Sequence, residues 1–202
     1  MTDDLDFAAM LCSRLCHDLI SPVGAVGNGV ELLRAMPEGG REEIGLIEDS
    51  AKAAQAALAF FRIGFGMVGA DARALSSREL GGVAAAYFGP SRHRLAWPVE
   101  GADLPRGLAK LMLLMLLSAA TATPIGGALT VAPPRDDPPR LSVRASGRKA
   151  GLSAEHVAMA QGAAPATAPR EAHLALMAQV AARAGLSVEI AQSEEAVEIV
   201  AS

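Results

Sequence analysis

Two stretches of the sequence carry apolar residues at alternating steps of three and four, the spacing that lines one side of a long α-helix. They cover residues 4–36 and 41–68, and the Pro-Glu-Gly-Gly segment at 37–40 separates them. Proline and glycine in that order break a helix. The sequence therefore predicts two antiparallel helices joined by a short turn, an αα-hairpin. The seams are Cys12, Leu15, Leu19, Val26 and Leu33 in the first helix, and Ile44, Ile47, Ala51, Ala54, Leu58, Phe61, Phe65 and Val68 in the second.

A single hairpin cannot cover both of its apolar seams, whereas four helices can. We expect two chains to pair as a homodimer through a four-helix bundle. The alternative is that the hairpin packs on the C-terminal part of its own chain. Apolar residues make up 51% of the chain and aromatic residues only 3%, so the core must be built from Ala, Leu, Val and Met, which suits close helix packing.

His17 lies on the opposite side of the first helix from the apolar seam. At ~100° per residue, the residues that share its side are mostly small or polar. They are Asp6, Ser13, Arg14, Ser21, Gly24, Asn28 and Glu31, interrupted only by Met10 and Ala35. We therefore expect the imidazole to project into solvent near the middle of the bundle.

The six residues from His17 to Pro22 read His-Asp-Leu-Ile-Ser-Pro. This order resembles the phosphoacceptor motif of histidine kinases, which is a histidine, an acid, two further residues, Ser or Thr, and a proline that bends the helix. The longer stretch 11–33 is similar to the alphaproteobacterial histidine phosphotransferases. The resemblance implies that His17 accepts a phosphoryl group; the alternative is an ordinary surface histidine.

Beyond residue 70 the pattern changes to shorter, mixed elements. Ser76 with Glu79 three residues later predicts a capped helix that ends near Phe88. Further helices are expected at 104–120, 154–161 and 171–184, and strands at 94–99, 129–132, 141–145, 186–191 and 196–201. The sequence thus predicts an α+β protein with a helical hairpin over residues 1–70 and an α/β sandwich over residues 71–202.

The order of these elements resembles the ATP-binding domain of histidine kinases, but the residues that bind nucleotide in that family are missing. The segment Met115–Ala122 contains no Asn, and Ala145 stands where the adenine-binding Asp belongs. Lys149 replaces the second glycine of the same motif, and only Gly147 remains. The region 162–170, where a phosphate loop is expected, is rich in Ala and Pro. We therefore predict a degenerate domain that binds no cofactor and does not use ATP.

The resemblance implies a phosphorelay protein that shuttles phosphoryl groups by way of His17. Its partners would be the receiver domain of a hybrid histidine kinase and response regulators, among them cell-cycle regulators of the CtrA type. The receiver would supply the magnesium ion, so the chain needs no cofactor or metal of its own. The predicted site roles are an imidazole-holding acid at Asp18, a polar contact to the phosphoryl group at Ser21, and partner contacts at Arg14, Gly24 and Asn28.

Two other functions fit the same residues. The alternatives are a histidine kinase with eroded ATP motifs and a non-catalytic dimeric scaffold that binds receiver domains. His93, His156 and His173 lack motif context and are expected to serve surface or packing roles.

Composition excludes several other classes. The net charge of −4 shows no excess of basic residues of the kind that binds nucleic acid. The apolar run 111–120 is about half of the ~20 residues that a membrane span needs. Acidic residues at 3, 4 and 6 stand where a secretion signal would be basic. Cys12 and Cys16, four residues apart on one helix, suit neither a disulfide nor, without further ligands, a zinc site. We expect a cytoplasmic protein without nucleic-acid or membrane partners.

Overall fold

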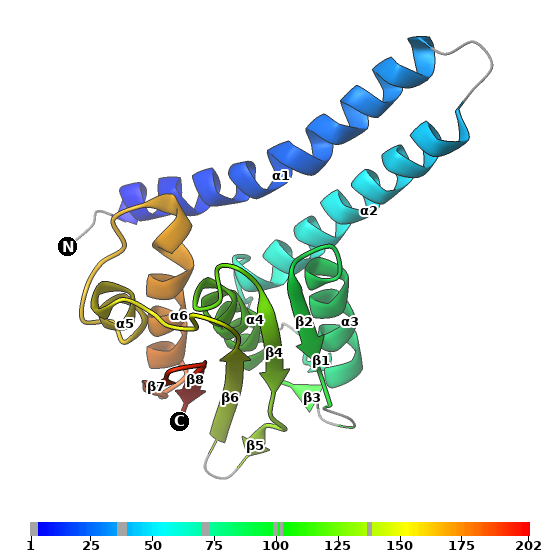
Figure 1. The fold of residues 1–202 in the computed structure, drawn as a ribbon. Helices are drawn as coiled ribbons and strands as arrows, with labels where there is room; N and C mark the ends of the chain where they lie inside the picture. Colours follow the sequence, from blue (N-terminus) through cyan, green and yellow to red (C-terminus); the bar gives the residue numbers. More distant parts are fainter. Residues whose placement is uncertain (1–3, 36–39, 70–72, 99–100, 102, 137–138) are drawn as a thin grey trace.

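The computed structural model describes residues 4–35, 40–69, 73–98, 101, 103–136 and 139–202. The chain begins with a helical hairpin, α1 (Asp4–Ala35) and α2 (Arg41–Gly64), which extends away from the rest of the molecule (Figure 1). Gly40 is the N-cap of α2, and the other residues of the predicted turn lie outside the described ranges. The two predicted hairpin helices are confirmed, and α1 continues through Pro22.

The two hairpin helices approach each other closely at Gly29, the buried residue of α1. A Cβ atom placed at Gly29 would lie 2.6 Å from Cγ1 of Ile47 on α2, which is closer than carbon atoms pack. Glycine is therefore required at this crossing for steric reasons. The seam residues Leu15 and Leu19 of α1 are half-buried and pack against the hydrophobic core.

The second helix ends earlier than its apolar pattern predicts. The seam continues to Val68, but α2 ends at Gly64. The ammonium of Lys110 donates to the carbonyl oxygen of Gly66 at 2.9 Å and reaches that of Phe65 at 3.5 Å. A lysine that binds the last carbonyls stabilises a helix C-terminus. The predicted end at residue 68 is wrong: α2 ends at Gly64, and the backbone at Gly66 passes so close to the carbonyl oxygen of Arg62 that a Cβ atom there would clash with it. Lys110 binds the carbonyls that follow this end.

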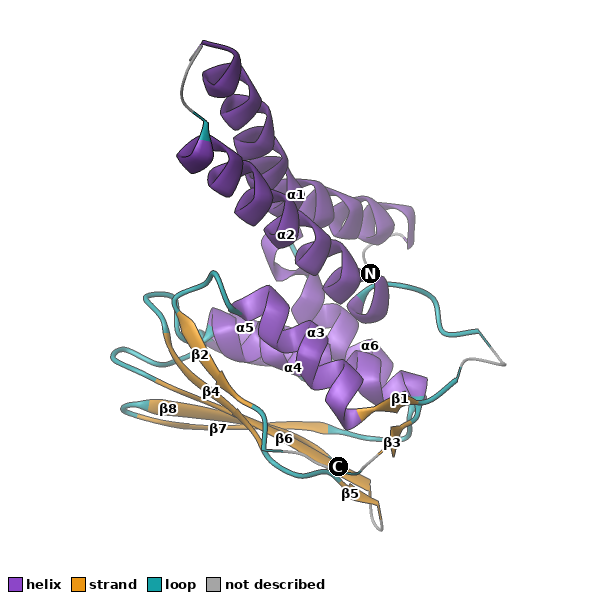
Figure 2. Cartoon of the chain, turned by 90° about the vertical axis from the view of Figure 1, so that its right-hand side faces the viewer, coloured by secondary structure: helices purple, strands orange, loops and turns teal. Residues whose placement is uncertain are grey.

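The C-terminal domain is one sheet covered on one face by helices, which separate it from the hairpin (Figure 2). The sheet has the order β2-β4-β6-β8-β7, with β2 and β4 parallel and the other neighbours antiparallel. Its strands are β2 (His93–Ala96), β4 (Gly127–Val131), β6 (Pro139–Ser146), β7 (Val188–Ser193) and β8 (Ala196–Ala201). The helices are α3 (Ser77–Phe88), α4 (Arg106–Thr121), α5 (Ala154–Ala160) and α6 (Ala172–Arg183), with a 3₁₀ turn at Pro169–Glu171. The predicted α+β class and α/β sandwich are confirmed.

Helix α4 lies at the centre of this domain. Its residues from Ala109 to Ala119 are all buried, because α4 packs against the sheet, α6 and α2 at once. A helix enclosed on every side is apolar around its whole circumference. This burial explains the apolar run at 111–120. Within the described ranges, no helix has the length and hydropathy that crossing a bilayer would require.

The predicted capping box at the start of α3 is present. The Ser76 hydroxyl accepts a hydrogen bond from the backbone N–H of Glu79 at 3.2 Å, and the Glu79 carboxylate accepts one from the backbone N–H of Ser76 at 3.0 Å. A hydrogen bond from Arg73, followed by those from Ser76, lowers the pKa of Glu79 to about 2. The helix ends at Phe88, as predicted.

Three two-residue strands were not anticipated. They are β1 (Leu75–Ser76) and β3 (Asp103–Leu104), which pair with each other, and β5 (Arg135–Asp136), which pairs with the start of β6. Two residues are too few to show a periodic pattern, so their pairing is decided by the chain around them.

Candidate functional site

His17 projects from the middle of α1 with 84% of its side chain exposed. Its Nδ1 lies 3.0 Å from Oδ1 of the next residue, Asp18. Asp18 itself is only 17% exposed, so its carboxylate is held against the protein while the imidazole extends outward. The helix thus presents an accessible ring beside a fixed negative charge.

A second contact holds the same carboxylate. The Nε of Arg14 donates to Oδ2 of Asp18 at 2.8 Å, and the terminal Nη1 of Arg14 donates to the carbonyl oxygen of Arg170 at 2.9 Å. Only 19% of the Arg14 side chain is exposed. The sequence predicts that Arg14 contacts a partner. In the structure its guanidinium already binds the hairpin through Asp18 and the C-terminal domain through Arg170.

Tyr87 is part of this site and was missed by sequence reasoning. It lies near the end of α3, and its ring stacks on Phe60 of α2 with 4.2 Å between ring centroids. Burial, and secondly the negative charge of Asp18, raises its pKa to about 12, so the phenol keeps its proton at neutral pH. Nothing in the sequence around the chain's single tyrosine distinguishes it from a core aromatic.

A groove of about 790 Å³ runs beside His17, between the hairpin and the C-terminal domain. Ser21 and Pro22 of α1 line it on one side, and Tyr87 and His93 line it on the other. Asp49 and Ser50 of α2, together with the end of α4, complete the walls. The predicted residue Ser21 is exposed at this groove. Gly24 and Asn28 are exposed further along α1 but do not line the groove.

The three remaining histidines have packing or pairing roles in the structure. His93 lies 3.0 Å from the carbonyl oxygen of Thr123, and His156 lies 3.6 Å from a carboxylate oxygen of Glu171. His173 is fully buried in α6, and its Nε2 is 3.1 Å from the hydroxyl of Thr121. Burial lowers the pKa of His173 to about 3, so it is neutral at physiological pH.

Residues of the two segments in which we predict that nucleotide-binding function is lost are packed in the core. Ala145 has no exposed surface and is paired in the sheet between Leu129 and Val197. Met115 is likewise fully buried in α4. Gly147 is the one glycine of the predicted motif that remains. Its presence has a steric explanation, because a Cβ atom there would lie 2.9 Å from the carbonyl oxygen of Gly126.

Side chains that could bind a metal ion are dispersed over the described parts of the chain. No group of three His, Cys, Asp or Glu side chains comes close enough there to hold an ion. Cys12 and Cys16 are exposed free thiols on α1.

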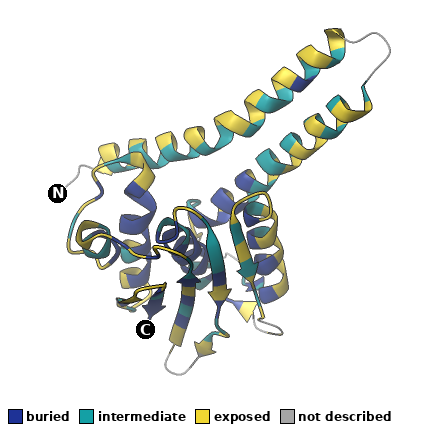
Figure 3. Cartoon of the chain, in the orientation of Figure 1, coloured by how far each residue is buried: buried dark blue, intermediate teal, exposed yellow. Residues whose placement is uncertain are grey.

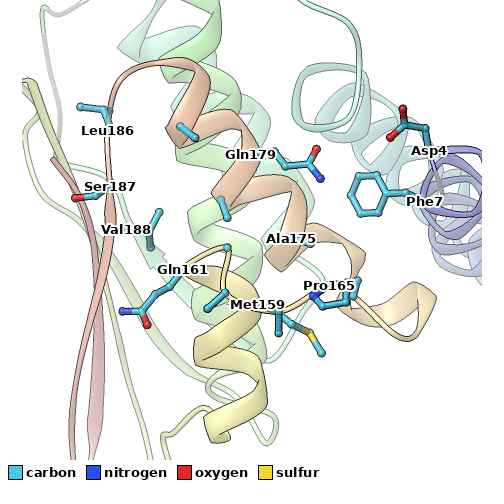
Figure 4. A pocket seen from close by; sticks show the side chains of 16 residues that line it. Asp4, Phe7, Met159, Gln161, Pro165, Ala175, Gln179, Leu186, Ser187 and Val188 are labelled. Carbon is cyan, nitrogen blue, oxygen red and sulfur yellow. The ribbon is translucent and has the colours of Figure 1, made fainter. Parts of the chain in front are cut away.

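Two further cavities lie away from His17. One, also about 790 Å³, is enclosed by the start of α1, the segment after α5, and α6; Phe7 faces Gln179 across it (Figure 4). Phe7 is ten residues from His17, which is about 15 Å along a helix. The other, about 570 Å³, is an apolar groove on the hairpin itself, lined by Leu11 and Leu15 of α1 and by Leu58, Phe61 and Phe65 of α2.

Comparison with known proteins identifies the class to which this fold and site belong. A sequence profile described as "Histidine phosphotransferase C-terminal domain" matches residues 77–196. The chain belongs to the histidine phosphotransferase family.

Two individual proteins show the same relationship. The protein phosphotransferase ChpT of Brucella abortus (strain 2308) is 40% identical over 172 residues, which are 84% of this chain and 80% of that protein. The solved structure described as "1.7 Angstrom Structure of a Bacterial Phosphotransferase" superposes with a TM-score of 0.82 at 32% identity, over 100% of this chain and 98% of the other. The predicted family and the phosphotransferase role are thereby confirmed.

Proposed function

We propose that His17 takes a phosphoryl group from the phospho-aspartate of one receiver domain and passes it to the aspartate of another. The donor is the receiver of a hybrid histidine kinase, and the acceptors are response regulators, including cell-cycle regulators of the CtrA type. The observation that carries this proposal is the exposed imidazole of His17, which has a fixed carboxylate on one side and a groove of about 790 Å³ beside it. In this proposal a helix of the partner packs into that groove.

We infer different roles for the two ring nitrogens. Because Nδ1 of His17 faces the Asp18 carboxylate, Nδ1–H donates and the lone pair is left on Nε2. Nε2 attacks phosphorus, an N–P bond forms, and the P–O bond to the receiver aspartate breaks. The electron pair of that bond leaves with the receiver's carboxylate, so no proton has to move.

The product ring carries a positive charge while Nδ1 keeps its proton. The Asp18 carboxylate opposes that charge, as the acid behind a catalytic histidine does in hydrolases. The reverse reaction loads the next receiver. The barrier for such a transfer is lowered mainly by alignment and charge stabilisation, which an exposed ring on a rigid helix provides. Ser21 contacts the phosphoryl group from the groove, while Gly24 and Asn28 leave space for the partner along α1.

The chain itself uses neither ATP nor a bound metal in this proposal. The buried side chains of Ala145 and Met115 offer no hydrogen-bonding group to a nucleotide. Magnesium prefers carboxylate oxygens, and the receiver's own acidic residues supply them.

We further propose that the working unit is a cytoplasmic homodimer. Exposed and half-buried residues run the length of the hairpin, whereas buried residues concentrate in the C-terminal domain (Figure 3). The apolar groove of about 570 Å³ lies on the hairpin, and Leu58 at its rim is 50% exposed. A second hairpin would cover this surface and complete a four-helix bundle.

Label transfer tests the phosphotransfer proposal. A receiver domain phosphorylated beforehand on its aspartate is mixed with the parent protein, with His17→Gln, and with His156→Gln as the matched control. We expect the parent and His156→Gln to take up label and His17→Gln to bind the receiver without taking up label. Equal labelling of His17→Gln would remove His17 from the mechanism.

Two labelling experiments separate the proposed function from its alternatives, an ATP-dependent kinase and a non-catalytic scaffold. Incubation with labelled ATP alone should leave the chain unlabelled, and labelling under those conditions would make it a kinase. A parent protein that binds phosphorylated receivers but never acquires label would be a scaffold.

A further inference from the structure

We propose that Arg14 is a positioning residue for phosphoryl transfer, through which the C-terminal domain sets the orientation of the His17 ring. The inference rests on the function proposed above, because it concerns the same histidine. It gives Arg14 a task different from the partner contact that its place on the helix face suggests.

The chain of contacts runs through four groups without interruption. The carbonyl oxygen of Arg170 accepts from Nη1 of Arg14 at 2.9 Å, and Nε of Arg14 donates to Oδ2 of Asp18 at 2.8 Å. The other carboxylate oxygen, Oδ1, is 3.0 Å from Nδ1 of His17. Arg170 lies 156 positions from Arg14 in the sequence, in the 3₁₀ turn that leads into α6 and lies under α1 (Figure 1).

Guanidinium geometry suits this task better than an ammonium would. Its Nε and Nη donors point in fixed directions within one plane, so Arg14 can bind a carboxylate and a carbonyl at the same time. An ordinary exposed i, i+4 ion pair contributes little, because two long side chains must be held in one geometry. Here Arg14 and Asp18 are only 19% and 17% exposed, and the second domain already orders the arginine.

The consequence for His17 is a fixed hydrogen-bond acceptor. With Oδ2 bound to Arg14, the carboxylate cannot rotate freely, and Oδ1 remains directed at Nδ1. The hydrogen bond at one ring nitrogen decides which nitrogen of a histidine is free. The contact from the C-terminal domain therefore keeps the lone pair on Nε2, the nitrogen that faces the partner.

The surroundings of Arg14 are consistent with a fixed cation. His173 is fully buried in α6, and burial followed by the nearby charge of Arg14 keeps it neutral. Its hydrogen bond with Thr121 joins α6 to α4, which holds the turn containing Arg170 in place. Tyr87 interacts electrostatically with both Arg14 and Asp18, and burial raises its pKa so that the phenol stays uncharged.

The test compares Arg14→Gln and Arg14→Lys with Arg34→Gln, which changes an exposed arginine at the far end of α1. Each protein is labelled with ¹⁵N in its histidine rings, and NMR reports the tautomer of His17 without any partner. Stopped-flow transfer from a phosphorylated receiver then gives the maximal rate and KM separately.

We expect Arg14→Gln to shift the His17 ring toward the Nε2–H tautomer and to lower the maximal rate about tenfold. KM for the receiver should stay within about twofold of the parent. Arg14→Lys should recover part of the rate, and Arg34→Gln should match the parent in both measurements.

A raised KM with an unchanged maximal rate and an unchanged tautomer would overturn the proposal and make Arg14 a partner contact. If the parent accepts no phosphoryl group, the proposed function fails, while the tautomer shift without a partner still decides the role of Arg14. If Arg14→Gln does not fold, the ring tautomer of Arg14→Lys decides: a shift part of the way toward Nε2–H supports the proposal, and a tautomer unchanged from the parent overturns it.

Discussion

The ammonium of Lys110 lies 2.9 Å from the carbonyl oxygen of Gly66, so a side chain of α4 binds the segment that follows α2. Lys110 is buried, and that burial lowers its pKa. The contact between Arg14 and Arg170 ties α1 to the turn before α6 in the same way. A cation thus donates to a backbone carbonyl at two junctions with the C-terminal domain, one at α1 and one at the segment after α2.

Replacing Lys110 by Met should weaken the joint at α2. The carbonyls of Phe65 and Gly66 lose their donor, and a hydrogen bond from a charged group contributes about 1.5–3 kcal/mol. We expect the free energy of unfolding in urea to fall by an amount in that range. Lys52→Met, at an exposed lysine of α2, is the control and should change it by less than about 0.5 kcal/mol. Equal effects of the two substitutions would contradict the prediction.

Two glycines of α1 should respond in opposite directions to the same substitution. Gly29→Ala places a methyl group 2.6 Å from Cγ1 of Ile47 and should destabilise the protein by about 1–3 kcal/mol. Gly27 has open space around its Cα, so Gly27→Ala should stabilise the helix by up to about 1 kcal/mol. Thermal unfolding of both variants checks the pair. Stabilisation by Gly29→Ala would show that the helices can separate at this crossing without cost.

Acid should destabilise the protein through His173. Its pKa is about 3 when folded against an ordinary value of 6.5, so the unfolded chain binds more protons between these values. The free energy of unfolding should therefore fall as pH drops below 6.5, by at most about 1.4 kcal/mol per pH unit from this group. Urea unfolding at pH 5 and pH 8 should show a smaller difference in His173→Gln than in the parent. The same difference in both proteins would assign the acid sensitivity to other groups.

Removing the charge of Asp18 should slow phosphoryl transfer. Asp18→Asn keeps the shape of the side chain but no longer opposes the charge that develops on the His17 ring. We expect the transfer rate at saturating receiver to fall on the order of a hundredfold. Asp6→Asn, an exposed acid on the same face of α1, serves as the control and should transfer at the parent rate. Transfer by Asp18→Asn at the parent rate would reduce Asp18 to an ordinary helix residue.

A charge in the apolar groove of the hairpin should prevent pairing of two chains. Leu58 is half-exposed at that groove, and Leu58→Glu would place a carboxylate where a second hairpin packs. We expect the parent to sediment as a dimer and Leu58→Glu as a monomer. Gln55→Glu, at an exposed position one turn earlier on α2, should leave the dimer intact. A monomeric parent would contradict the four-helix bundle.

Much of the local structure followed from short-range patterns. The heptad seams predicted α1 and most of α2, because side chains three and four apart share one face of a helix. Ser76 with Glu79 predicted the start of α3, because the two residues can exchange capping hydrogen bonds. The same periodicity placed His17 on the outer face, where it is 84% exposed. The end of α2 was placed too late because the apolar seam continues past it to Val68, although glycines at 64 and 66 favour a helix end there. The lysine of α4 that binds the segment after α2 has no counterpart in that local pattern.

The sequence by itself determined the candidate phosphoacceptor, since the motif around His17 and its place on a helix are both local properties. Only the tertiary structure decided how that residue is held. The carbonyl of Arg170 and the phenol of Tyr87 come from elements distant in the sequence, and neither bears a recognisable pattern. They meet Arg14 and Asp18 because α1 packs across the helices of the C-terminal domain, and long-range packing of this kind leaves no periodic trace in a single sequence.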